Sequence, residues 1–184
     1  MWKTIAKQFA KPDGFKGRCA ATMMNFMNHQ MYHDVMKLIK DDKQTILDVG
    51  FGNGYVMKHL MYQGHRIYGL EVSDSMIKQV NNKYLKAINQ TMFIEKGGIE
   101  HLPYKDHFFD VIYSINTIYF WESLDAGLKE LYRCSNTNGK VILSFYDQAF
   151  LSVMSLASSG FKLYKKETVI KTIREHGFII TNLI

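Results

Sequence analysis

The alternation of apolar and polar positions along the chain predicts short strands separated by amphipathic helices. Stretches of six or seven residues are rich in Ile, Val, Leu, Phe and Tyr, as is typical of buried strands. These runs predict strands over residues 45–50, 66–72, 91–97, 109–115, 140–146 and 178–184.

The segments between these runs repeat their apolar residues at helical spacing. Residues 20–39 carry Met24, Met27, Met31 and Val35 on one face and predict a long N-terminal helix. Further helices are predicted over residues 54–64, 74–88, 124–134 and 165–177. Ser73 and Ser123 are placed to cap two of them, and Gly177 to end the last. We expect a turn at 136–139 ("NTNG") and a loop over 147–164.

Strands that alternate with helices predict βαβ units with right-handed crossovers and a mostly parallel sheet. We therefore expect a doubly wound α/β fold with helices on both faces of the sheet. The whole chain, residues 1–184, is predicted to be a single domain. Residues 1–44 would form an N-terminal helical lid and residues 45–184 the ligand-binding core.

Composition narrows the class of protein without identifying it. The chain is 47% apolar and carries a formal charge of +6, which permits contact with nucleic acid but does not require it. Its lysines are scattered, so nucleic-acid binding is not favoured. The two cysteines have no metal-ligand spacing, no apolar run is long enough to span a membrane, and the N-terminus lacks a signal-peptide pattern. We expect a cytoplasmic protein.

The most informative segment is "DVGFGNGY", residues 48–55, where a strand breaks into alternating glycines before a helix. In a doubly wound sheet, ligands bind beyond the carboxyl ends of the strands. Glu71 ends the next predicted strand, where a carboxylate can accept both hydroxyls of a ribose. The alternative for Glu71 is a solvated charge in a loop.

The glycine spacing and its neighbouring residues distinguish between three kinds of ligand: a dinucleotide, the phosphates of a nucleotide, and S-adenosylmethionine. A dinucleotide site needs a small residue where this chain has Tyr55, and a phosphate loop needs a G-K-[ST] sequence that is absent. Asp48 also disfavours a pyrophosphate, because two anions would lie side by side. S-adenosylmethionine has an ammonium, a sulfonium and a ribose but no phosphate, and it fits this segment.

Four segments together resemble the class I S-adenosylmethionine-dependent methyltransferases. They are "ILDVGFGNG", "GLEVSDSMI", "GGIEHLPYKDHFFDVIYS" and "GLKELYRCSNTNGKVILSF", in the order and spacing of that family, over about residues 45–180. The chain is similar to the branch of the ubiquinone- and menaquinone-biosynthesis methyltransferases (methyltransferase type 11). "KPDGFKGR", "MNFMNH" and "NTIYFW" look like an uncharacterised bacterial subgroup. The resemblance implies a Rossmann-like fold and S-adenosylmethionine as cofactor, with S-adenosylhomocysteine as product.

The resemblance also implies roles for individual residues. Asp48 would orient the cofactor's ammonium, Glu71 would hold the ribose and Val72 would pack on the adenine. Gly98 stands where the family often has an Asp that holds the adenine amine, so a backbone group near Gly98 and Ile99 is expected to serve instead. The remaining residues implied to line the site are Gly50, Phe51, Gly52, Gly54, Ser114, Ile115 and Asn116.

The expected reaction is an in-line displacement, in which the protein supplies alignment and a dry cavity. We expect a small, partly apolar acceptor, with Tyr119 and His29 as candidate catalytic residues. Asn116 and Tyr119 match the ends of an Asn/Asp-Pro-Pro-Tyr signature of amino-methylating enzymes, but both prolines are replaced. Aromatic packing is the alternative for Tyr119. His29 lies four residues from His33 with no third ligand apparent, so no metal is predicted.

Two other functions remain open at the level of sequence. One is methylation of RNA or protein, which would need an open basic face. The other is a non-catalytic S-adenosylmethionine-binding protein. The family usually adds one more antiparallel strand after the segment that matches 178–184. Without it, the sheet edge would be bare, and we expect a homodimer or a disordered edge there.

Overall fold

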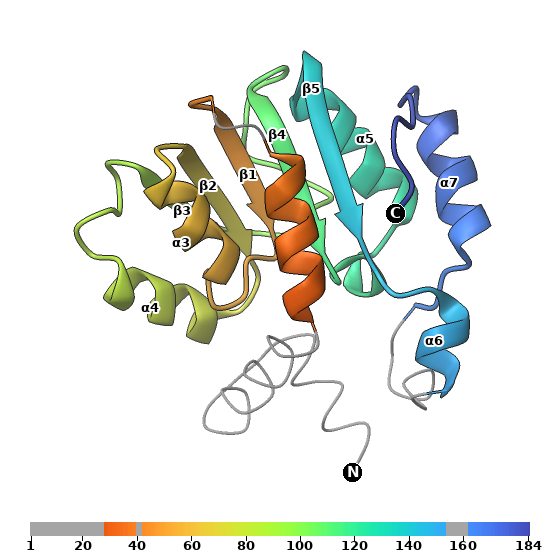
Figure 1. Cartoon of the computed structure of the whole chain (residues 1–184), viewed down its shortest axis with the longest axis horizontal. Coiled ribbons are helices and arrows are strands. Elements are labelled where there is room, and N and C mark those ends of the chain that lie inside the picture. The colour runs from red at the N-terminus through yellow and green to blue at the C-terminus, as the bar shows by residue number, and fades with distance from the viewer. Residues whose placement is uncertain (1–27, 40–41, 154–161) are drawn as a thin grey trace.

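A parallel sheet forms the centre of the molecule (Figure 1). The computed structural model describes residues 28–39, 42–153 and 162–184. Within them the strands pair in parallel in the order β3-β2-β1-β4-β5. This arrangement confirms the predicted α/β fold. The strands are β1 (Thr45–Val49), β2 (Arg66–Glu71), β3 (Met92–Lys96), β4 (Phe109–Ile115) and β5 (Ser135–Ser144).

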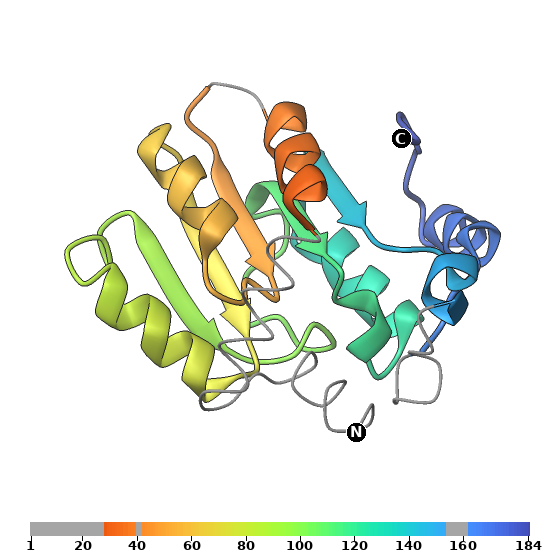
Figure 2. The same cartoon turned by 60° about the horizontal axis from the view of Figure 1, so that its bottom comes forward.

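Helices cover both faces of this sheet (Figures 1 and 2). Residues 28–38 are helical and lie on one face with α3 (Tyr55–Tyr62) and α4 (Asp74–Lys83). The opposite face packs against α5 (Leu124–Cys134) and α7 (Lys166–Glu175). The short η1 (Ile118–Phe120) and α6 (Gln148–Val153) follow β4 and β5. None of the described helices is long and apolar enough to cross a lipid bilayer.

Successive side chains of β1 point to opposite faces, as the period of a strand requires. Ile46 packs with the core under α3, whereas Leu47 and Val49 pack with the core under α5. Asp48 therefore belongs to the α3 face, and it hydrogen-bonds Tyr113 of β4, which packs in that same core. The hydrophobic pattern of β1 thus fixes the face to which its single carboxylate points.

The capping predictions agree with the structure at several helix ends. The Ser73 hydroxyl accepts a hydrogen bond from the Met76 amide, and the Ser123 hydroxyl accepts one from the Ala126 amide. Gly177 follows the end of α7 with φ +85°, a conformation in which glycine avoids the cost of a Cβ. Of the helix predicted over 20–39, residues 28–38 are helical and 20–27 lie outside the described residues.

Other predicted boundaries are wrong. The predicted strand at 178–184 does not form, and Ile179 and Ile184 are about 90% exposed (89% and 93%). Apolar residues alone do not make a strand, because its backbone needs a neighbouring ladder, and no described strand pairs with this segment. Helix α4 ends at Lys83 rather than at 88, before a turn in which Asn89 has φ +60°. The predicted loop at 147–164 contains α6.

The predicted turn at 136–139 lies inside β5 instead of before it. Phe109 pairs with Ser135, but Val111 pairs with Lys140, so the intervening residues form an irregularity in the ladder. The Asn136 side-chain oxygen accepts the Asn138 amide over 3.0 Å, which is a local turn-like contact. The turn residues therefore bend the strand without ending it.

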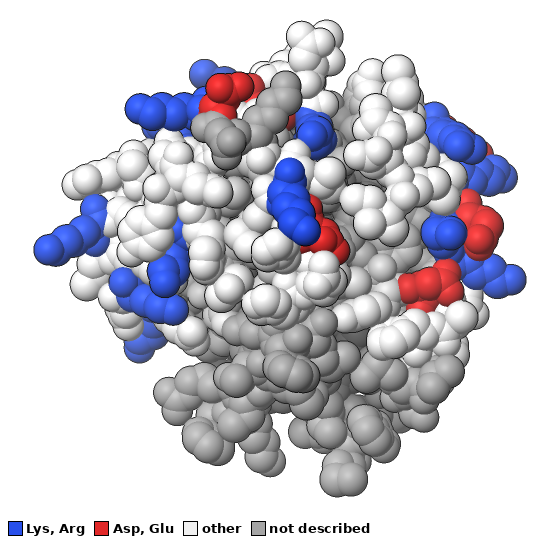
Figure 3. Space-filling model, in the orientation of Figure 1, with Lys and Arg blue, Asp and Glu red and all other residues white. Residues whose placement is uncertain are grey.

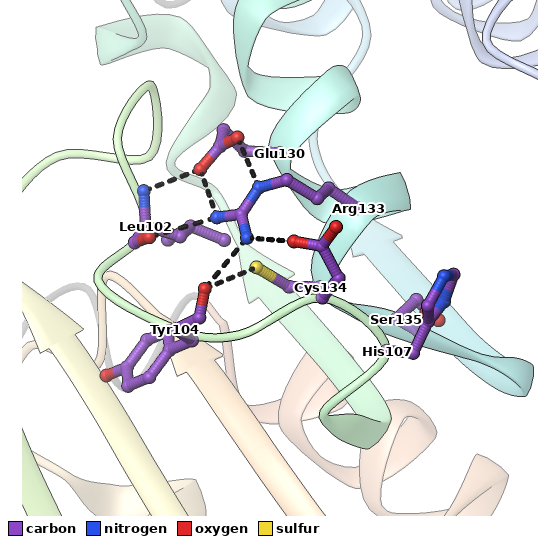
Figure 4. Close-up of polar contacts among 8 residues, drawn as sticks. Leu102, Tyr104, His107, Glu130, Arg133, Cys134 and Ser135 are labelled. Carbon is purple, nitrogen blue, oxygen red and sulfur yellow. Dashed lines mark hydrogen bonds and ion pairs between the residues drawn. The ribbon is translucent and has the colours of Figure 1, made fainter.

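No helix connects β3 to β4; residues 97–108 form a loop that α5 holds in place (Figure 4). The Arg133 guanidinium donates to the carbonyls of Leu102 and Tyr104 over 3.0 and 2.8 Å. It also pairs with Glu130 and Asp106, both at 2.7 Å. Glu130 in turn accepts the Leu102 amide. This Arg133 clamp fixes the loop that begins at the carboxyl end of β3.

Candidate functional site

A cavity of about 390 Å³ lies at the carboxyl ends of the strands, within the size range of small-molecule sites. The glycine loop after β1, the ends of β2 and β3, the loop after β4 and the helix at 28–38 all contribute to it. Among its lining residues are Asn28, Tyr32, Asp48, Gly50, Phe51, Gly52, Tyr55, Glu71, Val72, Met76, Gly98, Ile99, Glu100, Ile115, Asn116, Thr117, Phe120, Trp121 and Glu122.

Asp48 is a buried carboxylate at the end of β1, with 4% of its surface exposed. The Tyr113 hydroxyl donates a hydrogen bond to Asp48 Oδ2 over 2.6 Å. Burial raises the pKa of Asp48 to about 8. The bond from Tyr113 lowers this pKa, and the nearby Glu71 raises it by a smaller amount. A cation that entered the cavity would stabilise the charged form of this carboxylate.

Glu71 ends β2 and is held by backbone donors. The amides of Val72 and Ser73 donate to its Oε1 over 2.8 and 2.9 Å, and the Gly52 amide donates to its Oε2 over 3.0 Å. Burial raises the pKa of Glu71, and these bonds lower it by smaller amounts. A carboxylate has about four acceptor positions, so Glu71 retains capacity for a hydroxyl donor. Glu71 therefore ties the glycine loop to the end of β2.

The three glycines of the loop serve different purposes. All have positive φ, between +55° and +77°, where side chains with a Cβ are strained. A Cβ at Gly50 would overlap the Thr117 side chain, and a Cβ at Gly54 would meet Val80 of α4 at 3.1 Å. A Cβ at Gly52 would meet nothing within 4 Å. Gly50 and Gly54 therefore permit close packing, whereas Gly52 borders open space in the cavity.

A polar network joins the loop after β4 to the helix at 28–38. Asn116, at φ +56°, donates from its side-chain amide to Asn28 Oδ1 over 2.8 Å. The Tyr119 hydroxyl donates to Asn116 Oδ1 over 2.9 Å and accepts the Tyr146 amide. A non-glycine residue with positive φ is uncommon and is often found at functional sites. Asn116 is thus held from both sides at the cavity wall.

The structure brings most of the predicted site residues together but leaves four outside the cavity lining. His29 is exposed, Gly54 packs on α4, and Ser114 is buried with its hydroxyl bonded to the Val49 carbonyl. Tyr119 is 2% exposed and lies behind Asn116. Among the described residues, no cluster of His, Cys, Asp and Glu could hold a metal ion.

Sequence reasoning missed Tyr113, Thr117 and Glu100. Tyr113 reaches Asp48 across the β1–β4 pairing, where the two residues are partners in register. Thr117 lies against Gly50 and accepts a hydrogen bond from Trp121 Nε1 over 3.0 Å. Glu100 lies within the segment "GGIEHLPYKDHFFDVIYS", but its place beside Gly98 depends on the folded loop. Only strand order and loop conformation bring these residues to the site.

The described lining of the cavity is rich in carboxyl groups, although the chain has a net positive charge. Asp48, Glu71, Glu100 and Glu122 line it, whereas the described part of the lining includes no Lys or Arg. This donor set fits S-adenosylmethionine, which carries cationic centres and a ribose but no phosphate. Asp48 would hold the ammonium, Glu71 the ribose and Val72 the adenine face.

Comparisons with known proteins agree with this geometry. A family model described as a methyltransferase domain matches residues 47–143, more than half of the chain. The uncharacterized methyltransferase YdaC of Bacillus subtilis is 30% identical over 106 residues, covering 54% of this chain and 55% of that protein. A malonyl-[acyl-carrier protein] O-methyltransferase of Erwinia billingiae is 30% identical over 114 residues, 62% of this chain and 43% of that protein. The chain thus spans about half the length of these relatives.

A solved structure gives a fuller match in fold. It is from the complex between the Haloferax volcanii Trm112 methyltransferase activator and a methyltransferase, at a TM-score of 0.75 and 19% identity. The match covers 96% of this chain and 75% of that chain. The match to the family model, the parallel sheet and the glycine loop with its two carboxylates lead to one conclusion. The chain belongs to the methyltransferase-domain family of class I S-adenosylmethionine-dependent methyltransferases.

Proposed function

We propose that the protein transfers the methyl group of S-adenosylmethionine to a small, partly apolar acceptor. The observation that carries this proposal is the composition of the cavity wall. Asn28 and Tyr32 of the helix at 28–38 line it together with the glycine loop, and its described residues include no Lys or Arg. A cavity lined by aromatic side chains and carboxyl groups, with no described basic residue, suits a small molecule better than a nucleic acid backbone.

The protein's contribution would be to hold both substrates and exclude water. The cofactor's sulfonium, when bound, supplies a methyl group that is already activated. Asp48 would bind the ammonium of the cofactor's amino-acid portion and Glu71 its ribose, while Gly52 adds no side chain where the loop borders open space. Because alignment of the reacting groups supplies much of the rate in such displacements, no metal or redox group is required by the proposal.

The acceptor is proposed to be neutral or cationic. Tyr32, Phe120 and Trp121 offer aromatic surface in the lining, and the described carboxylates there would repel an anion. The Erwinia relative is named for a malonyl acceptor, which carries a carboxylate. The described lining of this chain offers no basic side chain to pair with one, so we propose a different acceptor.

Tyr119 is proposed to position Asn116 and not to act as a general base. Its hydroxyl is already engaged by Asn116 and by the backbone of Tyr146. Burial raises the pKa of Tyr119 well above that of an exposed tyrosine, which makes proton loss near neutral pH unfavourable. His29, exposed and outside the lining, is not proposed as a base either.

The main alternative within the fold, methylation of RNA, would need a broad basic surface. On the face in Figure 3 the Lys and Arg side chains are scattered, with groups toward both flanks and others near the centre, and several lie beside acidic side chains. This distribution favours a small molecule. A non-catalytic binding protein is the other alternative, and it would bind the cofactor without turnover.

The test combines titration calorimetry with a product screen. Wild-type protein should bind both S-adenosylmethionine and S-adenosylhomocysteine. Incubation with isotopically labelled cofactor and small-molecule cell extract should then yield a labelled product by mass spectrometry. Binding without any labelled product, in extract or with RNA, would favour the non-catalytic alternative. Label only in the RNA fraction would contradict the small-molecule proposal. Localisation of the protein in the cytoplasm stays a prediction, and cell fractionation tests it.

A further inference from the structure

We propose that Glu100 recognises the exocyclic amine of the cofactor's adenine, a role that Gly98 cannot fill because it has no side chain. The proposal rests on S-adenosylmethionine being the cofactor. It assigns base selectivity to a side chain two residues further along the loop after β3.

Strand order predicts where the base must lie. β3, β2 and β1 are neighbours in that order, so their carboxyl ends form a row. Asp48 is the penultimate residue of β1 and Glu71 ends β2, where the ammonium and the ribose would bind. The ribose joins the amino-acid portion to the base, so the base must lie beyond Glu71, at the end of β3. Gly98, Ile99 and Glu100 line the cavity there.

The amine of adenine is a hydrogen-bond donor and needs an acceptor. Asp48 already accepts the Tyr113 hydroxyl and lies at β1, and Glu71 accepts three backbone amides. Glu122 is exposed. Glu100 uses one oxygen, Oε1, to accept the Glu122 amide over 2.6 Å. Within the described part of the chain, its other oxygen, Oε2, has no hydrogen-bond partner and is available at the base end.

The absence of a side chain at Gly98 makes room for this carboxylate. A Cβ at position 98 would lie 3.0 Å from Glu100 Oε2, tighter than nine in ten contacts of real Cβ atoms. A side chain at position 98 would therefore displace this carboxylate from its present position by a few tenths of an ångström. The Glu100 side chain is also held in a fixed orientation. Its Oε1 accepts the amide of Glu122, which precedes the Ser123 cap of α5, and the Arg133 clamp holds the loop.

The proposal is tested by titration calorimetry with S-adenosylhomocysteine and its analogue that lacks the exocyclic amine. We expect Glu100→Ala to weaken S-adenosylhomocysteine binding about tenfold or more, as expected for a charge-assisted hydrogen bond. Binding of the amine-free analogue should change less than about twofold, since it makes no bond to lose. Equal weakening of both ligands would overturn the proposal.

A second variant separates recognition from folding. In Glu100→Gln the side-chain oxygen can still accept the Glu122 amide, but an NH₂ donor now faces the base. S-adenosylhomocysteine should bind more weakly, and the 6-oxo analogue, S-inosylhomocysteine, should bind more tightly than it does to wild type. Unchanged relative affinities would overturn the proposal even if Glu100→Ala were unstable.

Glu122→Gln is the matched control, because it removes one negative charge from the same rim. It should change the affinities for both purine ligands by the same factor, whereas the Glu100 variants should change their ratio. If wild-type protein bound neither ligand, the cofactor assignment itself would fail. If wild type bound but the ratio never moved, only the role of Glu100 would fail.

Discussion

The two carboxylates at the ends of β1 and β2 are stabilised by different kinds of donor. Glu71 accepts backbone amides of the chain around it, which a local turn supplies. Asp48 depends on one side chain, Tyr113, which is 65 residues away in sequence. Asp48 is buried and accepts fewer hydrogen bonds than Glu71. Its ionised form is therefore less well stabilised by the protein than that of Glu71. At the scale of residues, this difference makes Asp48 the titrating group of the site.

Cofactor affinity is therefore expected to rise with pH toward about 8, the pKa of Asp48. Below that pH the carboxyl is protonated, and binding an ammonium must displace the proton, which costs at most about tenfold in affinity per pH unit. Titration calorimetry with S-adenosylhomocysteine from pH 6 to 9 measures this slope. In Asp48→Asn the affinity should be lower and the slope lost. A slope that persisted in that variant would assign it to another group.

The same pKa predicts the effect of pH on folding. Asp48 has a raised pKa in the folded state, so its contribution to stability is present below its ordinary value of 3.8 and is lost as pH rises through about 8. Wild-type protein should lose stability relative to Asp48→Asn between those values. Urea unfolding at several pH values measures this difference, and parallel curves for the two proteins would contradict the assignment.

Gly52 should tolerate a side chain in the fold but not in ligand binding. Gly52→Arg places a long cation in the open space of the cavity and should abolish binding of S-adenosylhomocysteine. The left-handed backbone should also cost about 1–2 kcal/mol of stability. Gly64→Arg is the control, because Gly64 has φ +94° and lies outside the cavity lining. It should lower the melting temperature similarly and leave binding intact. Retained affinity in Gly52→Arg would show that the loop does not contact the ligand.

Glu71→Ala is expected to weaken cofactor binding by about 1–3 kcal/mol, the range for lost hydrogen bonds to a charged group. Stability should fall as well, because the amides of Gly52, Val72 and Ser73 lose their acceptor. Calorimetry and urea unfolding measure the two effects separately. Glu167→Ala on the exposed start of α7 is the control. If Glu71→Ala bound the cofactor with wild-type affinity, Glu71 would serve only to hold the glycine loop.

At the scale of elements, the loop at 97–108 shows how one helix can position a segment that has no secondary structure of its own. The loop has no helix between β3 and β4, and its path is determined by bonds from Arg133 and Glu130 on α5. Tyr104 of the loop packs edge to face against the buried Phe109 and against the half-buried Tyr68. The base end of the cavity is thus built on α5 as well as on β3.

Arg133→Met should lower the free energy of unfolding by about 2 kcal/mol, because two carbonyls and two carboxylates lose a charged donor. Arg133 lowers the pKa of Glu130, so this stabilisation is present above the ordinary Glu pKa and is lost as pH falls through the lowered pKa of the folded state. Urea unfolding at pH 7 and at several pH values below the ordinary Glu pKa measures both effects. Arg174→Met on the exposed side of α7 is the control, and an equal loss in both variants would argue against a clamp.

At the scale of the whole molecule, apolar side chains are exposed where the last predicted strand does not form. Ile179, Leu183 and Ile184 are exposed, and among the described strands β5 pairs only with β4. We predict that wild-type protein forms a homodimer through this region. Light scattering after size exclusion should give a dimer mass that Ile179→Lys shifts toward monomer. A monodisperse wild-type monomer would contradict the prediction.

The sequence by itself determined the features that depend on neighbouring residues. Its apolar periods predicted β1 to β5, and local donors and acceptors predicted the caps at Ser73, Ser123 and Gly177. The glycine loop and its two carboxylates were also readable, because a chain that turns from strand to helix places them at one edge of a sheet.

Only the tertiary structure decided which distant segments meet. Asn28 and Asn116 are 88 residues apart and share a hydrogen bond, and Tyr113 reaches Asp48 because β4 pairs with β1. The apolar segment at 178–184 is not a strand, because no described neighbour offers it a ladder. The hydrophobic periodicity of a segment indicates which of its own side chains can be buried on one face. The partner that completes a hydrogen bond or a ladder depends on the order in which strands pack.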